Sequence, residues 1–125
     1  MIHPTAQKVA NAACDLGLNI KIKEHSETTR TAEDAANAVG CTVAQIVKSL
    51  MFLVDGRPTM ALVSGPNRLD EKKLAALCGV GKKKIKRADA DTVREATGFA
   101  IGGVPPFGHK TELPVYIDQD FWQFD

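Results

Sequence analysis

The sequence lacks the short motifs that mark the most familiar catalytic and nucleotide-binding sites. It contains no Walker-type G-x-x-x-x-G-K loop, no G-x-G-x-x-G turn and no G-x-S-x-G nucleophile motif. His3, His25 and His109 show no metal-ligand spacing with one another or with the cysteines. These absences argue against the common phosphate-loop, dinucleotide, serine-hydrolase and zinc sites, and we expect no metal or other cofactor.

The sequence also has few cysteines, no long apolar run and almost no net charge. The three cysteines form no C-x-x-C pair, which predicts free thiols in a reducing compartment and a core-filling role for Cys14, Cys41 and Cys78. No apolar run reaches transmembrane length, and the N-terminus lacks the pattern of a signal peptide. The 125 residues carry a formal net charge of +1, so any nucleic-acid contact must depend on a local patch. We expect one cytoplasmic domain without a membrane contact.

The longest apolar run, residues 46–54, carries a lysine in its middle. Its β-branched and aromatic residues predict a strand that is buried on both faces. Lys48 would share one face with Leu50 and Phe52, while Ser49 would point to the other face, which makes a Ser–Lys catalytic pair geometrically poor. A buried ammonium needs a partner or a cavity. We therefore predict that Lys48 meets an anionic ligand in a cleft; the alternatives are a lysine that snorkels at a sheet edge or pairs with a carboxylate.

The rest of the pattern mixes helices and strands. Helices are predicted over residues 4–16, 32–39, 71–78 and 88–97, with a helical turn over 42–45. Strands are predicted over residues 20–23, 59–63 and 113–118. Asp55 and Gly56 form a turn signal that should join residues 46–64 into an antiparallel hairpin. The pattern is typical of an α+β domain.

Two further segments suggest chemistry. Residues 82–87 place five cations in six positions: Lys82, Lys83, Lys84, Lys86 and Arg87. Such a run is ordinarily a solvated surface, yet in a near-neutral chain it can also hold phosphates. Residues 102–108 contain three glycines and two prolines, a combination that brings backbone N–H groups close to a ligand in a stiff loop. Together the two segments predict anion binding beside donors that can polarise a carbonyl.

Six collinear segments resemble the YbaK/prolyl-tRNA-synthetase-associated editing domain family. They are residues 31–36, 46–50, 65–70, 87–89, 97–106 and 114–118. The lysine strand and the Gly-Gly-Val-Pro-Pro loop are the most specific of them. The resemblance implies an α+β fold in which helices flank a mixed, barrel-like sheet.

The same resemblance implies a trans-editing deacylase, which hydrolyses the ester between a wrong amino acid and the 3′ end of a tRNA, typically tRNA(Pro). Lys48 matches the family's functional lysine, near the ribose and phosphate of the terminal adenosine. Gly102 and Pro106 match the GxxxP loop, whose backbone, with Gly103, would lie next to the aminoacyl carbonyl. Ser49 occupies a position that varies among subfamilies and would tune the amino-acid pocket. Alanine, cysteine, serine and threonine all remain open as the amino acid removed.

Thr31 and His109 complete the set of predicted substrate-binding residues. Thr31 begins the first matching segment, and His109 lies just past the loop, where it would position water or a hydroxyl group unless it is an ordinary surface histidine. The expected partners are the aminoacyl-tRNA acceptor end, contacted by the basic run 82–87, and prolyl-tRNA synthetase. Two alternatives to the enzyme stay open: a non-catalytic module that binds tRNA or a synthetase, and a structural remnant without a specific ligand.

The C-terminal end is the one departure from the family pattern. Residues 1–125 are expected to form an editing domain that is short at its C-terminus, because family members commonly continue further. Phe121, Trp122 and Phe124 would then cover a sheet edge or mediate self-association. We accordingly expect a monomer or a weak homodimer.

Overall fold

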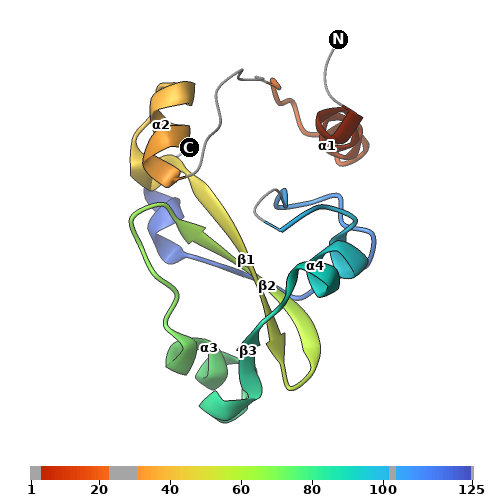
Figure 1. The fold of residues 1–125 in the computed structure, drawn as a ribbon. Coiled ribbons are helices and arrows are strands. Elements are labelled where there is room, and N and C mark those ends of the chain that lie inside the picture. Colours follow the sequence, from red (N-terminus) through yellow and green to blue (C-terminus); the bar gives the residue numbers. More distant parts are fainter. Residues whose placement is uncertain (1–3, 23–30, 102–103, 125) are drawn as a thin grey trace.

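The computed structural model describes residues 4–22, 31–101 and 104–124, and the predicted hairpin lies at the centre of its sheet (Figure 1). The strands are β1 (Val47–Val54), β2 (Arg57–Ser64), β3 (Ile85–Arg87) and β4 (Val115–Ile117). The helices are α1 (Pro4–Asp15), α2 (Ala32–Val39), α3 (Glu71–Cys78) and α4 (Ala90–Thr97), with the 3-10 helices η1 (Val43–Gln45), η2 (Lys82–Lys84) and η3 (Gln119–Gln123). These elements confirm the α+β prediction.

The hairpin of β1 and β2 is paired along the full length of both strands. The register runs from the Val47–Ser64 pair to the turn at Asp55 and Gly56. Both turn residues have positive φ angles, 51° and 80°, as in the turns that match the twist of a hairpin. β3 adds antiparallel to β1 and β4 adds parallel to β2, which gives the order β3-β1-β2-β4. The sheet is therefore mixed, as the resemblance implied.

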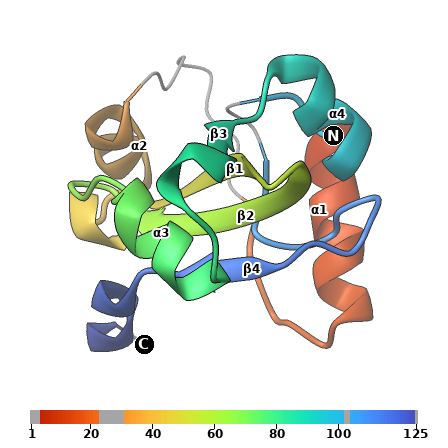
Figure 2. The same cartoon turned by 90° about the horizontal axis from the view of Figure 1, so that it is seen from below.

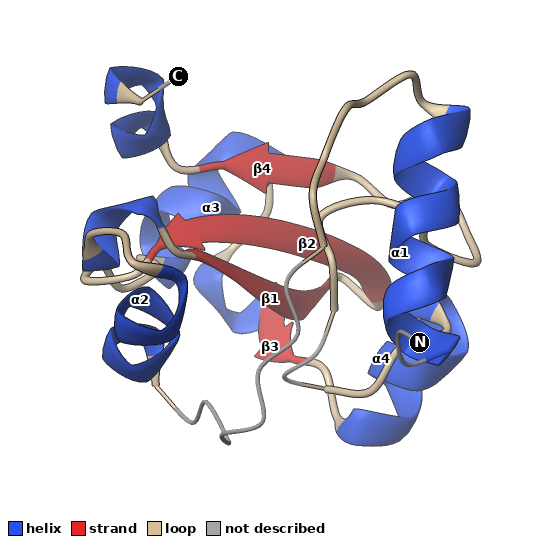
Figure 3. Ribbon diagram, turned by 90° about the horizontal axis from the view of Figure 1, so that it is seen from above, coloured by secondary structure: helices blue, strands red, loops and turns tan. Residues whose placement is uncertain are grey.

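Side chains of β1 enter two hydrophobic cores, one on each face of the sheet. Met51 lies in one core with Val93 of α4, and Phe52 lies in the other with Leu74 of α3. Figure 2 shows α3 across the near face of the sheet, and Figure 3, from the opposite side, shows the same helix behind it. The predicted burial on both faces is thus confirmed for the second half of β1, whereas Val47 at its start is 44% exposed.

Polar side chains fix the starts of three helices. Thr31, Asp70 and Asp89 accept hydrogen bonds from backbone N–H groups in the first turns of α2, α3 and α4. The sequence predicts that the last of these helices begins at residue 88. The N–H of Ala88 instead donates to the carbonyl of Met51, which prolongs the pairing of β3, and α4 begins two residues later.

The strand predicted over residues 20–23 is wrong for the part that the structure describes. Residues 18–22 are irregular, and Ile20 is 44% exposed. Alternation of apolar and polar residues produces a strand only where a partner supplies hydrogen bonds, and β3 and β4 occupy the two edges of the sheet. β3 itself escaped prediction because Ile85 is its only apolar residue.

The cysteines are free thiols, but the core-filling role is wrong for one of them. Cys14 is exposed on α1, whose buried residue is its neighbour Ala13. Cys41 and Cys78 are half-buried. Because Ala13 is the one buried residue of α1, this helix presents only a narrow stripe to the rest of the described protein.

Near the C-terminus, η3 divides its aromatic residues between the core and the surface. Phe121 packs against the core that contains α4, while Trp122 is 73% exposed. Within residues 4–22, 31–101 and 104–124, no helix combines the length and the apolar character needed to cross a membrane.

Gly65 follows β2 at the point where η1 lies against it. A side chain there would collide with the backbone carbonyl of Val43, which cannot move aside as a flexible side chain can. Gly65→Ala should therefore lower the free energy of unfolding by about 1–3 kcal/mol, the usual cost of overpacking. Gly81→Ala is the matched control, because an added Cβ there meets nothing within 4 Å. Urea denaturation compares the two, and equal midpoints would contradict the close approach of η1.

Candidate functional site

Lys48, the second residue of β1, is half-buried and projects into the protein rather than into open solvent. Its Nζ donates a hydrogen bond of 2.5 Å to the backbone carbonyl of Asn67, in the turn between β2 and α3. The partner of the ammonium is therefore a neutral oxygen and not a carboxylate. A neutral partner satisfies one hydrogen bond of the ammonium without cancelling its positive charge.

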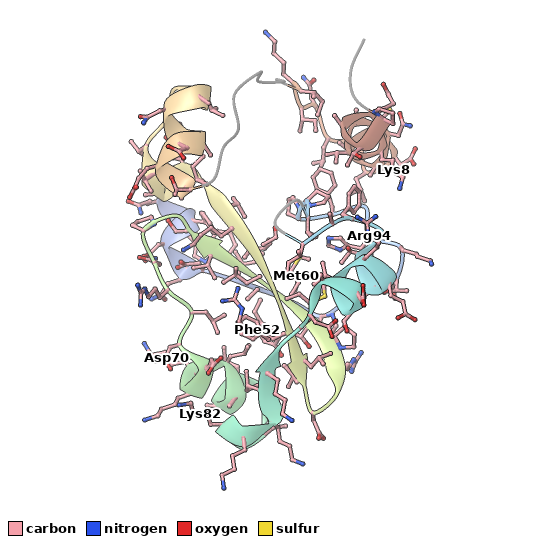
Figure 4. All side chains as sticks on the ribbon, viewed as in Figure 1. Lys8, Phe52, Met60, Asp70, Lys82 and Arg94 are labelled. Carbon is pink, nitrogen blue, oxygen red and sulfur yellow. The ribbon has the colours of Figure 1, made fainter. Side chains whose placement is uncertain are left out.

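Lys48 lines a cavity of about 660 Å³ between β1, the start of α3 and the basic run. We call it the basic cavity, because five of its lining residues are cationic: Lys48, Arg68, Lys72, Lys82 and Arg87. Asp70, Glu71 and the apolar residues Leu50, Phe52 and Leu69 complete the lining. Figure 4 shows Asp70 and Lys82 at the same end of the molecule, beyond Phe52 on the sheet. The cavity has the charge of an anion-binding site.

The structure divides the basic run between the cavity and the outer surface. Lys82 and Arg87 line the basic cavity, and the Arg87 guanidinium lies 5.9 Å from the centre of the Phe52 ring. The other cations of the run do not line it, and Lys84 pairs with Asp55 at 3.7 Å on the exposed surface. The predicted phosphate-binding run therefore contributes two cations to the cavity, from η2 and β3.

Asn67 is held in place by carboxylates from the C-terminal segment. Its Nδ2 donates to Asp118 (2.8 Å) and to Asp120 (2.7 Å), and Asp118 also accepts the backbone N–H of Ser64 (3.0 Å). Burial raises the pKa of Asp118. Hydrogen bonds from Asn67, from the Asp120 N–H and from the Ser64 N–H, together with the charge of Lys48, lower it by more, so the pKa lies below 3.8. Asp118 thus orients the turn that holds Lys48.

A second, smaller cavity lies on the opposite face of β1. Its volume is about 150 Å³, and we call it the small cavity. Apolar side chains form most of its wall, and Ser49 and Arg87 are its two polar residues. The complete lining is Ser49, Leu50, Met51, Met60, Arg87, Ala88, Val93, Ile101 and Val104. Ile101 and Val104 are the chain neighbours of Gly102 and Gly103, which lie outside the described residues. The small cavity has the size and chemistry to receive a small side chain.

The two cavities adjoin at the edge of the sheet. Lys48 and Ser49 point to opposite faces, as consecutive residues of a strand must. β3 pairs only with residues 52–54, so no strand of the described chain covers the preceding stretch of β1 on that side. Leu50 and Arg87 line both cavities. A ligand could therefore occupy both by crossing this edge.

Among the described residues, the predicted Thr31, Pro106 and His109 lie outside both cavities. Thr31 is exposed and caps α2, where its hydroxyl accepts the Asp34 N–H at 3.1 Å. Pro106 is exposed. His109 is half-buried, and a hydrogen bond of 2.7 Å joins its Nε2 to the carbonyl of Pro105, which requires a proton on Nε2. His109 therefore binds the Gly/Pro loop itself.

Four residues of this region were not predicted individually from the sequence: Asn67, Arg68, Lys72 and Asp118. Three of them lie in segments that resemble the editing family, residues 65–70 and 114–118, so the resemblance contained the signal. Lys72 follows directly in α3 and had no such signal.

Comparison with known proteins matches residues 26–125 to the model of one family, the aminoacyl-tRNA editing domain. The chain is 36% identical over 118 residues to the proline–tRNA ligase of Maridesulfovibrio salexigens, covering 94% of this chain and 19% of that protein. It is 31% identical over 103 residues to the proline–tRNA ligase of Thermoanaerobacter sp., covering 82% and 18%. The chain thus spans about a fifth of the length of these ligases.

Shorter relatives are covered more fully. The candidate Cys-tRNA(Pro)/Cys-tRNA(Cys) deacylase EbsC of Enterococcus faecalis is 31% identical over 100 residues, covering 79% of this chain and 60% of that protein. A crystal structure of a candidate trans-editing enzyme for prolyl-tRNA synthetase is 46% identical and superposes with a TM-score of 0.92, covering 99% of this chain and 78% of that one.

The Asp118 carboxylate should make stability depend on pH. Because its pKa lies below 3.8, its ionised form stabilises the fold above that value, and the contribution is lost as the pH falls through the lowered pKa. Asp118→Asn removes the charge and should cost about 1–3 kcal/mol at neutral pH, as hydrogen bonds to charged groups do. Urea denaturation of both proteins between neutral pH and pH 3 checks this. A difference in unfolding free energy that stays constant below pH 4 would contradict it.

Proposed function

Because the chain belongs to the aminoacyl-tRNA editing domain family, we propose that it is a cytoplasmic trans-editing deacylase. The proposed substrate is tRNA(Pro) that carries a wrong small amino acid, and the proposed partner is prolyl-tRNA synthetase. One observation carries this proposal: the basic cavity with Lys48 adjoins a small, mostly apolar cavity with Ser49. An aminoacyl-tRNA end has the same division, with negative phosphates on one side of the ribose ester and a small side chain on the other.

The proposed reaction needs no protein nucleophile. A water molecule attacks the ester carbonyl carbon, and the carbonyl oxygen becomes an oxyanion in the tetrahedral intermediate. The bond between that carbon and the ribose oxygen then breaks, and a proton that originates from the water ends on the ribose oxygen. The products are a free amino acid and a deacylated tRNA.

Lys48 would act by position. Its ammonium is fixed by the Asn67 carbonyl and faces the basic cavity, where it would hold the terminal ribose and phosphate. Holding the ester in one orientation removes much of the entropic cost of the reaction. This role requires only that the lysine stays charged and in place.

The Gly/Pro loop would stabilise the oxyanion. Backbone N–H groups of Gly102 and Gly103 are the proposed donors to the carbonyl oxygen. Their neighbours Ile101 and Val104 line the small cavity, which supports a position of the loop beside the aminoacyl group. His109 would maintain the shape of the loop through its bond to the Pro105 carbonyl.

The alternative is a non-catalytic module that binds tRNA or a synthetase through the same basic cavity. It is favoured by the similarity of this chain to one stretch of the proline–tRNA ligases, since a stretch of a larger enzyme can serve binding alone. Turnover separates the two: the enzyme hydrolyses its substrate, whereas the module binds tRNA without releasing the amino acid.

Lys48→Ala should slow deacylation by about 10- to 100-fold, because misplacement of the acceptor end costs that much. The measurement is single-turnover release of the amino acid from a panel of mischarged tRNA(Pro) and tRNA(Ala). Lys21→Ala is the control, since it removes an equal charge from an exposed residue outside both cavities. The enzyme is refuted if no tRNA in the panel is hydrolysed above background, and the role of Lys48 is refuted if its replacement leaves the rate unchanged.

Ser49→Ala should change which amino acid is removed. The hydroxyl is one of few polar groups in the small cavity, so its loss should lower the rate for seryl and threonyl esters about tenfold relative to the alanyl ester. The ratio of kcat/KM values within each variant is the readout, which makes the alanyl ester an internal control. An unchanged ratio would remove Ser49 from the amino-acid pocket.

A further inference from the structure

The basic cavity concentrates positive charge far beyond the average of the chain. Five cations and two carboxylates line it, an excess of three positive charges, whereas the whole chain has a net charge of +1. One of the two carboxylates is already engaged, because Asp70 Oδ1 accepts the backbone N–H groups of Lys72 (2.9 Å) and Lys73 (3.3 Å). The cavity therefore offers a strongly positive surface to a ligand.

None of these cations forms a salt bridge among the described residues, although Asp70 and Glu71 line the same cavity. In the described ranges 4–22, 31–101 and 104–124, the one salt bridge joins Lys84 to Asp55, outside the cavity. Like charges that outnumber the counter-charges near them repel one another, and a bound anion relieves that repulsion. Lys84 is thus paired outside the cavity, whereas Lys82 and Arg87, the two cations of the run that line the cavity, form no salt bridge among the described residues.

The size and position of the basic cavity favour a chain of phosphates. About 660 Å³ exceeds what one phosphate requires, and the cavity meets the small cavity at Leu50 and Arg87. Arginine binds phosphate oxygens with two parallel hydrogen bonds, while lysine acts as a mobile point charge. A site that combines arginine and lysine therefore suits a flexible nucleic-acid backbone whose successive phosphates lead toward the small cavity.

We propose that the five cations of the basic cavity hold the backbone phosphates of the single-stranded 3′ end of the tRNA. This inference rests on the proposed function, because an aminoacyl group in the small cavity fixes where the adjoining phosphates lie. It adds Arg68 and Lys72 to the tRNA-binding residues that the sequence predicts. It also places Lys83, Lys84 and Lys86 outside the phosphate-binding site.

The test compares two triple variants that each remove three positive charges. The cavity triple is Arg68→Ala, Lys72→Ala and Lys82→Ala, and the outer triple is Lys83→Ala, Lys84→Ala and Lys86→Ala. Fluorescence anisotropy measures the Kd for uncharged tRNA(Pro) transcript over a series of salt concentrations. We expect the cavity triple to weaken binding by roughly tenfold or more and to reduce the salt slope by about 2, since each single-strand phosphate contact contributes about 0.7. The outer triple should weaken binding less than about threefold.

A shortened RNA locates the contact. With the same transcript lacking its single-stranded 3′ end, wild type and the cavity triple should bind equally within about twofold. The inference is overturned if both triples weaken binding equally, if the cavity triple binds as wild type does, or if its loss persists on the shortened RNA. Circular dichroism verifies folding, and Arg68→Glu, at an exposed position, provides the same comparison if the triple does not fold.

The two proposals can fail separately, because this experiment measures binding and not hydrolysis. If the two triples differ in tRNA affinity but no deacylation is detected, the phosphate-binding proposal stands and the deacylase proposal is refuted. If deacylation is detected but the two triples bind tRNA with equal affinity, the deacylase proposal stands and the phosphate-binding proposal is refuted.

Discussion

Strand β3 is only three residues long, and the arrangement of the site depends on that shortness. It pairs with residues 52–54, so the edge of β1 ahead of them is free of any strand in the described chain. Lys48 and Ser49 are neighbours on this uncovered stretch, and because consecutive strand residues point to opposite faces they line different cavities. A longer β3 would cover the edge and separate the two cavities.

A second constraint joins the C-terminal segment to the hairpin. Asp118 receives hydrogen bonds from Ser64 at the end of β2 and from Asn67 in the following turn, and the Asn67 carbonyl receives Lys48. Residues from three distant parts of the chain thus share one polar network. The hydrogen bond from the Asn67 side chain helps to lower the pKa of Asp118 and also positions the residue whose carbonyl holds Lys48, so Asn67 links the electrostatics of the site to its geometry.

Local features were predictable from the sequence, and non-local ones were not. The hairpin turn at Asp55, the cap at Asp70 and the opposite directions of Lys48 and Ser49 follow from turn chemistry, capping and strand periodicity, each of which acts within a few residues. Which cations enter the basic cavity depends instead on how η2 and β3 turn against α3. Arg68 enters the cavity from the turn between β2 and α3, a position that its charge alone does not reveal.

The hydrogen bond between Lys48 and the Asn67 carbonyl has a consequence for how a ligand is met. An ammonium group carries three hydrogens, and this bond uses one of them and stops the group from rotating freely. Two hydrogens remain, and their directions are set by the protein before any ligand arrives. A backbone carbonyl does not disappear on side-chain substitution, so the lysine keeps this partner and the same two free donors whichever side chain stands at position 67.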